Sequence, residues 1–344
     1  MDTLETTSRR RFLRQSLAFS AGAGLTASLP AFANARVTSK PVNGARHALI
    51  VGDWGRDTSQ VGQRAVAAAM QRYQAARGIK TEALLMLGDS WYGELEGGVK
   101  SPRWQWQFEE MYPKSAFDCP AYSVLGNHDY QMWPESKVEA ELAYAKVPGA
   151  RWTMPARWYR FEFPKVNPLM TVIALDSNMP RAAKLGGRFA GRDFAMTEEQ
   201  RAEQLAWFET ELKKPRTTPF LTVIAHHPVY SDGPHGDHAT LIRDWDPLLQ
   251  QHKVQLYLAG HDHDLQHLEF EKHPTSFFLS GAGGADLYDL KVEPSVRGPY
   301  AEKVFGFSHL EMTAERIVLR HVNADGEVVH EFSKTPDGTV AMLA

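Results

Sequence analysis

Two histidines two residues apart follow an apolar run in the stretch Leu258-Ala259-Gly260-His261-Asp262-His263. This pattern is typical of a buried strand that passes through a glycine into a tight loop. Neutral imidazole is the commonest side-chain metal ligand, but an isolated His-x-His is more often a solvated turn. The interpretation as a metal site therefore depends on partners elsewhere in the chain.

Four other strand-like runs end in polar residues of the same kind. Those residues are Asp53 after 47–51, Asp89 and Tyr92 after 83–87, Asn127 and His128 after 121–125, and His226 after 220–225. Each one alone has an ordinary explanation as a turn former or a helix cap. In α/β sheets, however, ligands bind where the carboxyl ends of the strands meet, so five such ends favour one shared site.

The residue types indicate the chemistry of that site. Two Asp, one Asn, one Tyr and three His form a mixed oxygen and nitrogen set that is too large for one tetrahedral zinc and contains no thiolate. Seven ligands suit two adjacent metals that share a bridging carboxylate, an arrangement that fits hydrolysis of phosphate esters. A phenol has an ordinary pKa of about 10, so a tyrosine ligand favours a strongly Lewis-acidic ion such as ferric iron.

Runs with the period of a strand and runs with the period of a helix alternate along the chain. This pattern predicts an α/β protein that positions these residues. The pattern predicts helices at 60–77, 104–112, 136–146, 197–212 and 239–251, with Gly78 ending the first and a capping box at 197–200 starting the fourth. Further strands are expected at 158–163, 169–175 and 254–259. The last hundred residues are expected to be antiparallel, with strands at 276–279, 307–312, 317–322 and 328–332. Residues 178–196 have no periodicity and are expected to form a surface loop that could overhang the site.

Composition excludes several classes of protein. The formal charge of −3 over 344 residues argues against a nucleic-acid partner or binding to an anionic membrane. The single cysteine, Cys119, rules out an intramolecular disulfide. The chain is long for one domain, but a single α/β unit over 36–344 accommodates it.

Residues 1–35 are expected to be a twin-arginine signal peptide and not part of the fold. Ser8-Arg9-Arg10-Arg11-Phe12-Leu13-Arg14 is a basic segment with an arginine pair, and a weakly apolar stretch follows. Small residues offer cleavage after Ala33 or Ala35. The stretch is too short and too rich in Gly, Ala and Ser to span a bilayer. We therefore expect a bacterial protein exported in folded form by the twin-arginine machinery, periplasmic or secreted, without stable membrane insertion.

Five motifs resemble, in order, those of the purple acid phosphatases, which belong to the calcineurin-like metallophosphoesterases. The motifs are Gly52-Asp53-Trp54-Gly55, Gly88-Asp89-Ser90-Trp91-Tyr92, Gly126-Asn127-His128-Asp129, Val223-Ile224-Ala225-His226 and Gly260-His261-Asp262-His263. The similarity is greatest to the small tartrate-resistant type and covers roughly 47–332. It implies a four-layer sandwich, in which two mixed sheets pack face to face between helices. The cysteine pair of the mammalian enzymes has no counterpart here.

The resemblance also implies a role for each residue. Asp53, Tyr92 and His263 would hold ferric iron with Asp89 as the bridge, and Asn127, His226 and His261 would hold divalent iron, zinc or manganese. His128 and His235 would face the substrate and protonate the leaving group, after in-line attack by a metal-bound hydroxide on a small phosphate monoester. Asp129, Asp262 and Asp264 are expected to support the ligands or to form turns.

Two alternatives remain open at this point. A phosphodiesterase of the same superfamily, acting on cyclic nucleotides or phospholipid headgroups, would use the same metals, although Tyr92 argues against it. A non-catalytic periplasmic metal-binding protein would need the ligands but not His128. The sequence does not indicate the oligomeric state.

Overall fold

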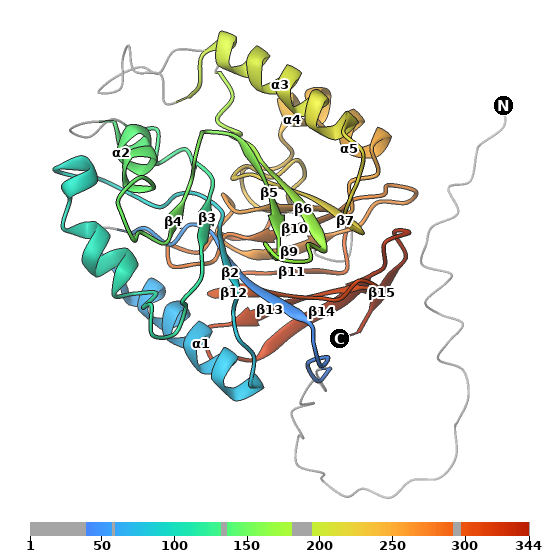
Figure 1. Ribbon diagram of the computed structural model, residues 1–344, viewed down its shortest axis with the longest axis horizontal. Helices are drawn as coiled ribbons and strands as arrows, with labels where there is room; N and C mark the ends of the chain where they lie inside the picture. Colours follow the sequence, from blue (N-terminus) through green and yellow to red (C-terminus); the bar gives the residue numbers. More distant parts are fainter. Residues whose placement is uncertain (1–38, 57–58, 132–135, 181–194, 292–296, 344) are drawn as a thin grey trace, which may run out of the picture. The chain divides into compact units, whose positions relative to one another are not determined.

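Two mixed β-sheets and flanking helices make up the described part of the protein (Figure 1). This computed structural model describes residues 39–56, 59–131, 136–180, 195–291 and 297–343, so the predicted signal peptide at 1–35 lies outside the described residues. From residue 39 onward the described residues belong to one compact unit.

The first sheet has eight strands in the order β15-β14-β13-β12-β1-β2-β3-β4. Strands β1 to β4 run parallel to one another, and the remaining strands are antiparallel. The bounds are β1 Arg46–Val51, β2 Ala83–Met86, β3 Ala121–Ser123, β4 Trp152–Thr153, β12 Gly306–Met312, β13 Ile317–Asn323, β14 Val328–Lys334 and β15 Val340–Met342.

The second sheet has seven strands in the order β11-β9-β10-β8-β7-β6-β5. Its central strands β6, β7, β8 and β10 are parallel, and antiparallel strands close both edges. The bounds are β5 Tyr159–Phe163, β6 Met170–Ala174, β7 Phe220–Ile224, β8 Leu256–Ala259, β9 Leu265–Leu268, β10 Ser276–Ser280 and β11 Tyr300–Glu302.

Helices cover the outer faces of the two sheets (Figure 1). On the second sheet, Val172, Ile224 and Leu258 belong to the core shared with the first sheet. Their neighbours Ile173, Val223 and Tyr257 pack instead with residues of α3 to α5, as the period of two along a strand requires. The helical bounds are α1 Val61–Arg77, α2 Lys137–Tyr144, α3 Glu198–Lys213, α4 Ala239–Asp244, α5 Asp246–Gln251, a 3₁₀ turn η2 Gly98–Lys100 and a π-helical segment η3 Trp104–Glu109. The four-layer arrangement confirms the predicted fold class.

Local signals set several of these boundaries. Gly78 ends α1 at φ 62°, a left-handed conformation that glycine adopts without strain. Thr197 and Gln200 form the predicted capping box at the start of α3. The final hairpin turns at Gly326, which has φ 91°.

Three expectations for the elements were wrong in detail. The single helix expected over 239–251 is divided at Trp245 into α4 and α5, because Pro247 in the first turn of α5 has no backbone N–H for a continuous helix. The segment expected as an ordinary helix at 104–112 is π-helical over its first six residues. Strand β10 was expected in an antiparallel region, yet it pairs in parallel with β8.

The short strands β4, β9, β11 and β15 have no signal of their own in the sequence. They contain two to four residues each, which is too short for an alternating pattern to be recognised. Their place in the sheets depends on pairing with neighbours that are remote in the chain.

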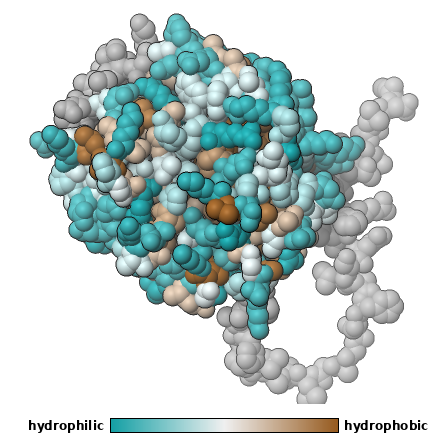
Figure 2. Space-filling model, in the orientation of Figure 1, coloured by the Kyte–Doolittle hydropathy of each residue, from teal (hydrophilic) through white to brown (hydrophobic). Residues whose placement is uncertain are grey.

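The surface seen in Figure 2 is mainly hydrophilic, and its apolar residues are scattered in small groups. Among the described residues the large apolar side chains that are exposed are Val61, Val147, Val166, Met342 and Leu343. None of the described helices has the length and apolar character needed to cross a bilayer. Cys119 is buried and unpaired.

Candidate metal centre

Glycines precede the polar residues at four of the five strand ends, and the close packing there requires them. A Cβ atom on Gly260 would lie 2.4 Å from Asp53 Oδ2, and one on Gly126 would lie 2.2 Å from Asp89 Oδ1. Real Cβ atoms do not approach other atoms so closely. The glycines therefore let the loops after the strands come together, so that a carboxylate from one loop contacts the backbone of another.

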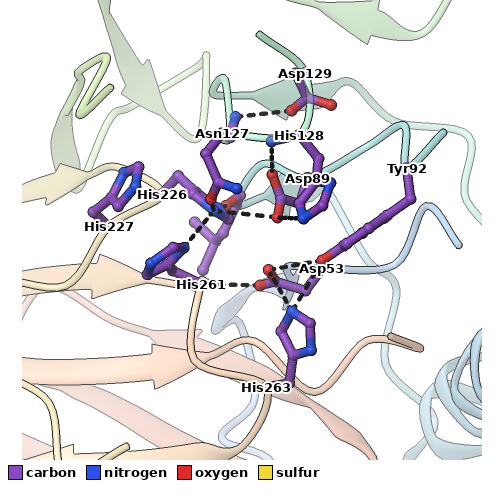
Figure 3. Close-up of polar contacts among 12 residues, drawn as sticks. Asp53, Asp89, Tyr92, Asn127, His128, Asp129, His226, His227, His261 and His263 are labelled. Atoms are coloured by element: carbon purple, nitrogen blue, oxygen red, sulfur yellow. Dashed lines mark hydrogen bonds and ion pairs between the residues drawn. The ribbon is translucent and has the colours of Figure 1, made fainter. Parts of the chain in front are cut away.

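The structure brings all seven predicted ligands to one place between the two sheets (Figure 3). Asp53, Asp89 and Tyr92 come from the loops after β1 and β2, and Asn127 from the loop after β3. His226, His261 and His263 come from the loops after β7 and β8 of the second sheet. The carboxyl ends of parallel strands from both sheets thus meet at the site, as expected.

One group of donors surrounds Asp53. Tyr92 Oη lies 3.0 Å from His263 Nε2 and 3.3 Å from Asp53 Oδ1, and His263 Nε2 lies 3.4 Å from Asp53 Oδ1. Side-chain oxygens of Asp53 and Asp89 and a ring nitrogen of His263 all lie within 4.8 Å of one another. These four side chains can converge on a single ion.

A second group surrounds His226. Its Nε2 atom lies 3.1 Å from Asn127 Oδ1, 3.2 Å from His261 Nδ1 and 3.5 Å from Asp89 Oδ2. Asp89 therefore belongs to both groups and would be shared by the two sites if each held an ion.

Backbone carbonyls orient two of the histidines. His226 Nδ1 lies 2.8 Å from the carbonyl oxygen of Leu87, and His263 Nδ1 lies 2.6 Å from that of Asp286. A proton on each Nδ1 leaves the lone pair of Nε2 directed at the centre. Hydrogen bonds of this kind to the far ring nitrogen usually fix the tautomer and the orientation of a histidine metal ligand. His261 presents Nδ1 instead, and its backbone N–H donates to Asp53 Oδ2 at 2.8 Å.

The electrostatics of the cluster favour bound cations. Burial raises the pKa of Asp53, whereas for Asp89 the effect of burial is outweighed by His226 and His128, which hold its pKa well below the usual range. Burial alone would lower the pKa of His226, but the two carboxylates raise it to about 10. Two buried carboxylates thus need positive charge beside them, and metal ions can supply it in place of a histidine proton.

Tyr92 is held as a neutral phenol by the protein alone. Burial, followed by the charges of Asp89 and Asp53, raises its pKa well above the ordinary value. Phenolate formation at this position needs a strongly Lewis-acidic ion.

The two predicted substrate-facing histidines both lie beside the donor cluster. The His128 ring packs on Tyr92 with centroids 4.1 Å apart, and its Nε2 lies 4.0 Å from Asp89 Oδ2. Its Nδ1 is buried. His235 lies half-exposed with its ring 4.2 Å from that of His261, and its Nδ1 lies 2.6 Å from Asp262 Oδ1.

The three remaining aspartates support loops, as expected. Asp129 accepts hydrogen bonds from the backbone N–H groups of Trp91 and Gly126. Asp262 points at His235 and Ser231 and not between the two donor groups. Asp264 accepts from Gln266.

Several residues near the centre had no recognisable signal in the sequence. Tyr288 stacks on His263 with centroids 4.0 Å apart, and His227 packs on His261 at 4.2 Å. His227 adjoins the predicted ligand His226, and ring nitrogens of His226, His227 and His261 all lie within 4.8 Å of one another. The Nδ1 atom of His227 lies 2.9 Å from Ser177 Oγ. Arg103 and Lys137 bind the backbone carbonyls around Tyr92. The part of the predicted loop at 181–194 lies outside the described residues.

Comparison with known proteins agrees with this geometry. The calcineurin-like phosphoesterase family matches residues 47–265. Tartrate-resistant acid phosphatase type 5 of Oryctolagus cuniculus is 30% identical over 298 residues, which is 81% of this chain and 87% of the relative. Purple acid phosphatase 7 of Arabidopsis thaliana is 28% identical over 304 residues, which is 86% of this chain and 87% of the relative.

Two solved structures share the fold. GAP50, the anchor in the inner membrane complex of Plasmodium, superposes with a TM-score of 0.69 at 21% identity and covers 83% of this chain and 87% of its own. Purple acid phosphatase PPD1 from yellow lupin has a TM-score of 0.61 at 16% identity and covers 86% of this chain and 55% of its own. The match over 47–265 and the full-length relatives show that the chain belongs to the calcineurin-like phosphoesterase family and is a metal-dependent phosphoesterase related to the purple acid phosphatases.

Proposed function

We propose that this protein is an exported acid phosphatase that hydrolyses phosphate monoesters at a binuclear metal centre. The observation that carries the proposal is the position of Tyr92, whose phenol oxygen lies within hydrogen-bonding distance of His263 and Asp53. A phenol among carboxylate and imidazole donors suits ferric iron. The related purple and tartrate-resistant acid phosphatases support the same activity.

In this proposal Asp53, Asp89, Tyr92 and His263 hold ferric iron. A divalent iron, zinc or manganese ion is held by Asp89, Asn127, His226 and His261. The two ions supply the nucleophilic water and the positive charge that binds the phosphate oxygens.

His128 and His235 protonate the leaving alcohol in this proposal. His128 is supported by its place beside the donor cluster, where its ring packs on Tyr92 and its Nε2 lies 4.0 Å from Asp89 Oδ2. His235 is supported by Asp262, which engages Nδ1 and leaves Nε2 for the substrate. Burial lowers the pKa of His128, so its protonated form, and with it the proposed activity, is favoured at acid pH.

The metal content and visible spectrum of the purified protein test the iron assignment. Iron-loaded wild type is expected to show a visible phenolate-to-iron band, and Tyr92→Phe should bleach it. A fully iron-loaded wild type without such a band would overturn the assignment.

Rates on phosphomonoesters and phosphodiesters across acid and neutral pH test the reaction. Faster hydrolysis of the monoesters supports an acid phosphatase, and faster hydrolysis of the diesters would make the protein a metallophosphodiesterase. Binding of two metals without hydrolysis of any ester would indicate a metal-binding protein without catalysis.

Export is part of the proposal and has its own test. The arginine pair Arg9-Arg10 supports the twin-arginine route to the periplasm. In a bacterial host, changing both arginines to lysine should retain the precursor in the cytoplasm, whereas Arg14→Lys should not. An unchanged periplasmic fraction in the double variant would contradict this route.

A further inference from the structure

A pocket adjoins the donor cluster on the side of His261. Its volume is about 360 Å³, and it reaches the proposed divalent site through Asn127 and His261. Figure 3 shows His227 beside His261, away from Asp53 and His263. The other polar residues that line the pocket are Asn178, His227, His235, His238 and Thr240.

Asn178 forms part of the pocket wall, and its side-chain amide is held in one orientation. Its amide nitrogen donates to the carbonyl oxygen of Leu125 at 3.0 Å and to Asp176 Oδ1 at 2.8 Å, which fixes the orientation of the amide. Its side-chain Oδ1 is buried and has no partner among the described residues, and the residue is only 3% exposed. Because this oxygen is buried, Asn178 gives the wall a fixed polar side chain but not an exposed acceptor.

His227 presents a donor. Ser177 Oγ accepts a hydrogen bond from the backbone N–H of His227 at 2.8 Å, so the hydroxyl proton is available for the ring Nδ1 at 2.9 Å. An acceptor Nδ1 places the proton of the neutral ring on Nε2.

His238 presents a second donor by the same reasoning. Its Nδ1 accepts from the backbone N–H of Leu241 at the start of α4, at 3.3 Å. Its Nε2 then carries the proton. Thr240, two residues further along, adds a hydroxyl to the same wall.

The described residues that line the pocket include no lysine, no arginine and no phenylalanine, tyrosine or tryptophan. A second phosphate group is usually held by cationic side chains, and a nucleobase by an aromatic face. The ring N–H donors of His227 and His238 and the hydroxyl of Thr240 are suited to neutral hydroxyl groups.

We propose that this pocket binds the polyhydroxylated alcohol portion of the substrate, so that the enzyme prefers polyol or sugar monophosphates to simple alkyl phosphates. This inference rests on the proposed function, because a phosphoryl group held at the metal centre places the ester oxygen at the mouth of the pocket. His235, a proposed proton donor, lies at that same mouth.

Kinetics on the metal-loaded protein test the inference. The quantity is the ratio of kcat/KM for sorbitol 6-phosphate to kcat/KM for butyl phosphate, which has no free hydroxyl. We expect a ratio above one in the wild type and a fall of about tenfold in His227→Phe, the usual effect of losing one hydrogen bond.

Conservative variants separate recognition from folding. His227→Gln keeps a side-chain N–H donor and is expected to retain the ratio. His238→Asn keeps a helix-capping side chain but shortens the donor, and it should lower the ratio. His252→Phe, at the end of α5 before β8 and so at the opposite end of that strand from His261, should leave the ratio unchanged.

Each result supports or overturns a distinct statement. A wild type that hydrolyses both esters with equal kcat/KM would overturn the pocket's role and leave the phosphatase assignment intact. A protein that hydrolyses no monoester would overturn the proposed function. In that case calorimetric titration with sorbitol 6-phosphate decides the pocket: weaker binding to His227→Phe than to wild type supports it, and equal affinity overturns it.

Discussion

At the scale of single residues, three of the proposed ligands occupy backbone conformations that most side chains avoid. Asp53, Asp89 and His261 have φ values of 58°, 51° and 71°. The left-handed region costs about 1–2 kcal/mol for a residue with a Cβ atom, and such outliers persist where the surroundings fix them and often mark functional sites. The three loops therefore accept strain in order to turn their side chains toward the cluster.

The two histidines of the loop after β8 should differ in effect. His261 contacts His226, whereas His263 contacts Tyr92 and Asp53. In the metal-loaded protein, His261→Ala should empty the divalent site preferentially, while His263→Ala should also abolish the visible band. Metal analysis together with the visible spectrum checks this, with His252→Ala as the control. Equal loss of both metals in the two variants would show that the pair does not divide between sites.

Gly260 should be as important for the centre as a ligand is. An added Cβ atom would lie 2.4 Å from Asp53 Oδ2, so Gly260→Ala should displace that carboxylate and lower the iron content several-fold. Gly149→Ala is the matched control, because its Cβ would meet nothing within 4 Å and only its φ of 82° is unfavourable. Its expected cost is about 1–2 kcal/mol of stability, without loss of iron. Full iron content in Gly260→Ala would contradict the close packing.

At the scale of elements, cationic side chains hold the loop that carries Tyr92. Arg103, just before η3, donates to the carbonyl oxygens of Tyr92 and Gly55 at 2.8 and 3.0 Å. Lys137, the first residue of α2, donates to those of Trp91 and Gly93 at 2.6 and 3.0 Å. The helical segments thus position the phenol by way of the backbone of its loop.

Lys137→Met should weaken this support. The substitution removes two hydrogen bonds to buried carbonyls and should lower the free energy of unfolding by roughly 2 kcal/mol. It should also lower the intensity of the visible band, because Tyr92 is held less firmly. Urea unfolding and the spectrum of the iron-loaded variant measure both effects. Lys146→Met, at an exposed lysine, is the control, and equal behaviour of the two variants would argue against this role of Lys137.

At the scale of the whole molecule, a buried lysine connects the two sheets. Lys334 at the end of β14 donates to the carbonyl oxygen of Pro274 at 2.6 Å and to Ser276 Oγ on β10 at 2.8 Å. Burial lowers the pKa of this ammonium group from 10.5 to about 8, against the opposing charge of Glu269. The folded protein therefore releases this proton more easily than the unfolded chain does.

The stability of the protein should reflect that difference. Between pH 8 and 10.5 the unfolded state binds more protons at Lys334, so this group makes the free energy of unfolding rise with pH. Below about pH 8 the buried ammonium group lowers the free energy of unfolding by its full amount. Between pH 8 and 9.5 the free energy of unfolding rises by about 2 kcal/mol as Lys334 loses its proton in the folded state. Urea unfolding at both pH values should show that Lys334→Met loses this increment and that Lys165→Met, at an exposed lysine, keeps it. The same pH slope in Lys334→Met and wild type would refute the assignment.

The sequence by itself determined the strands that carry the site and the residue types at their ends. An apolar run that ends in Gly and then Asp, Asn or His is a local pattern, and a local pattern can be recognised in the sequence without knowledge of the fold. Longer elements such as α1 and α3 were predictable because Gly78 and the Thr197 capping box act within one turn of helix.

The tertiary structure alone decided which of these residues meet and how the strands that carry them are ordered in the sheets. Strands of two to four residues depend on pairing with distant partners, and β10 took its parallel direction from β8. The pocket beside His261 is formed by Asn178, His227 and Thr240 from three separate stretches of the chain. Contacts of this kind depend on the packing of one sheet on the other, and no spacing along the chain encodes them.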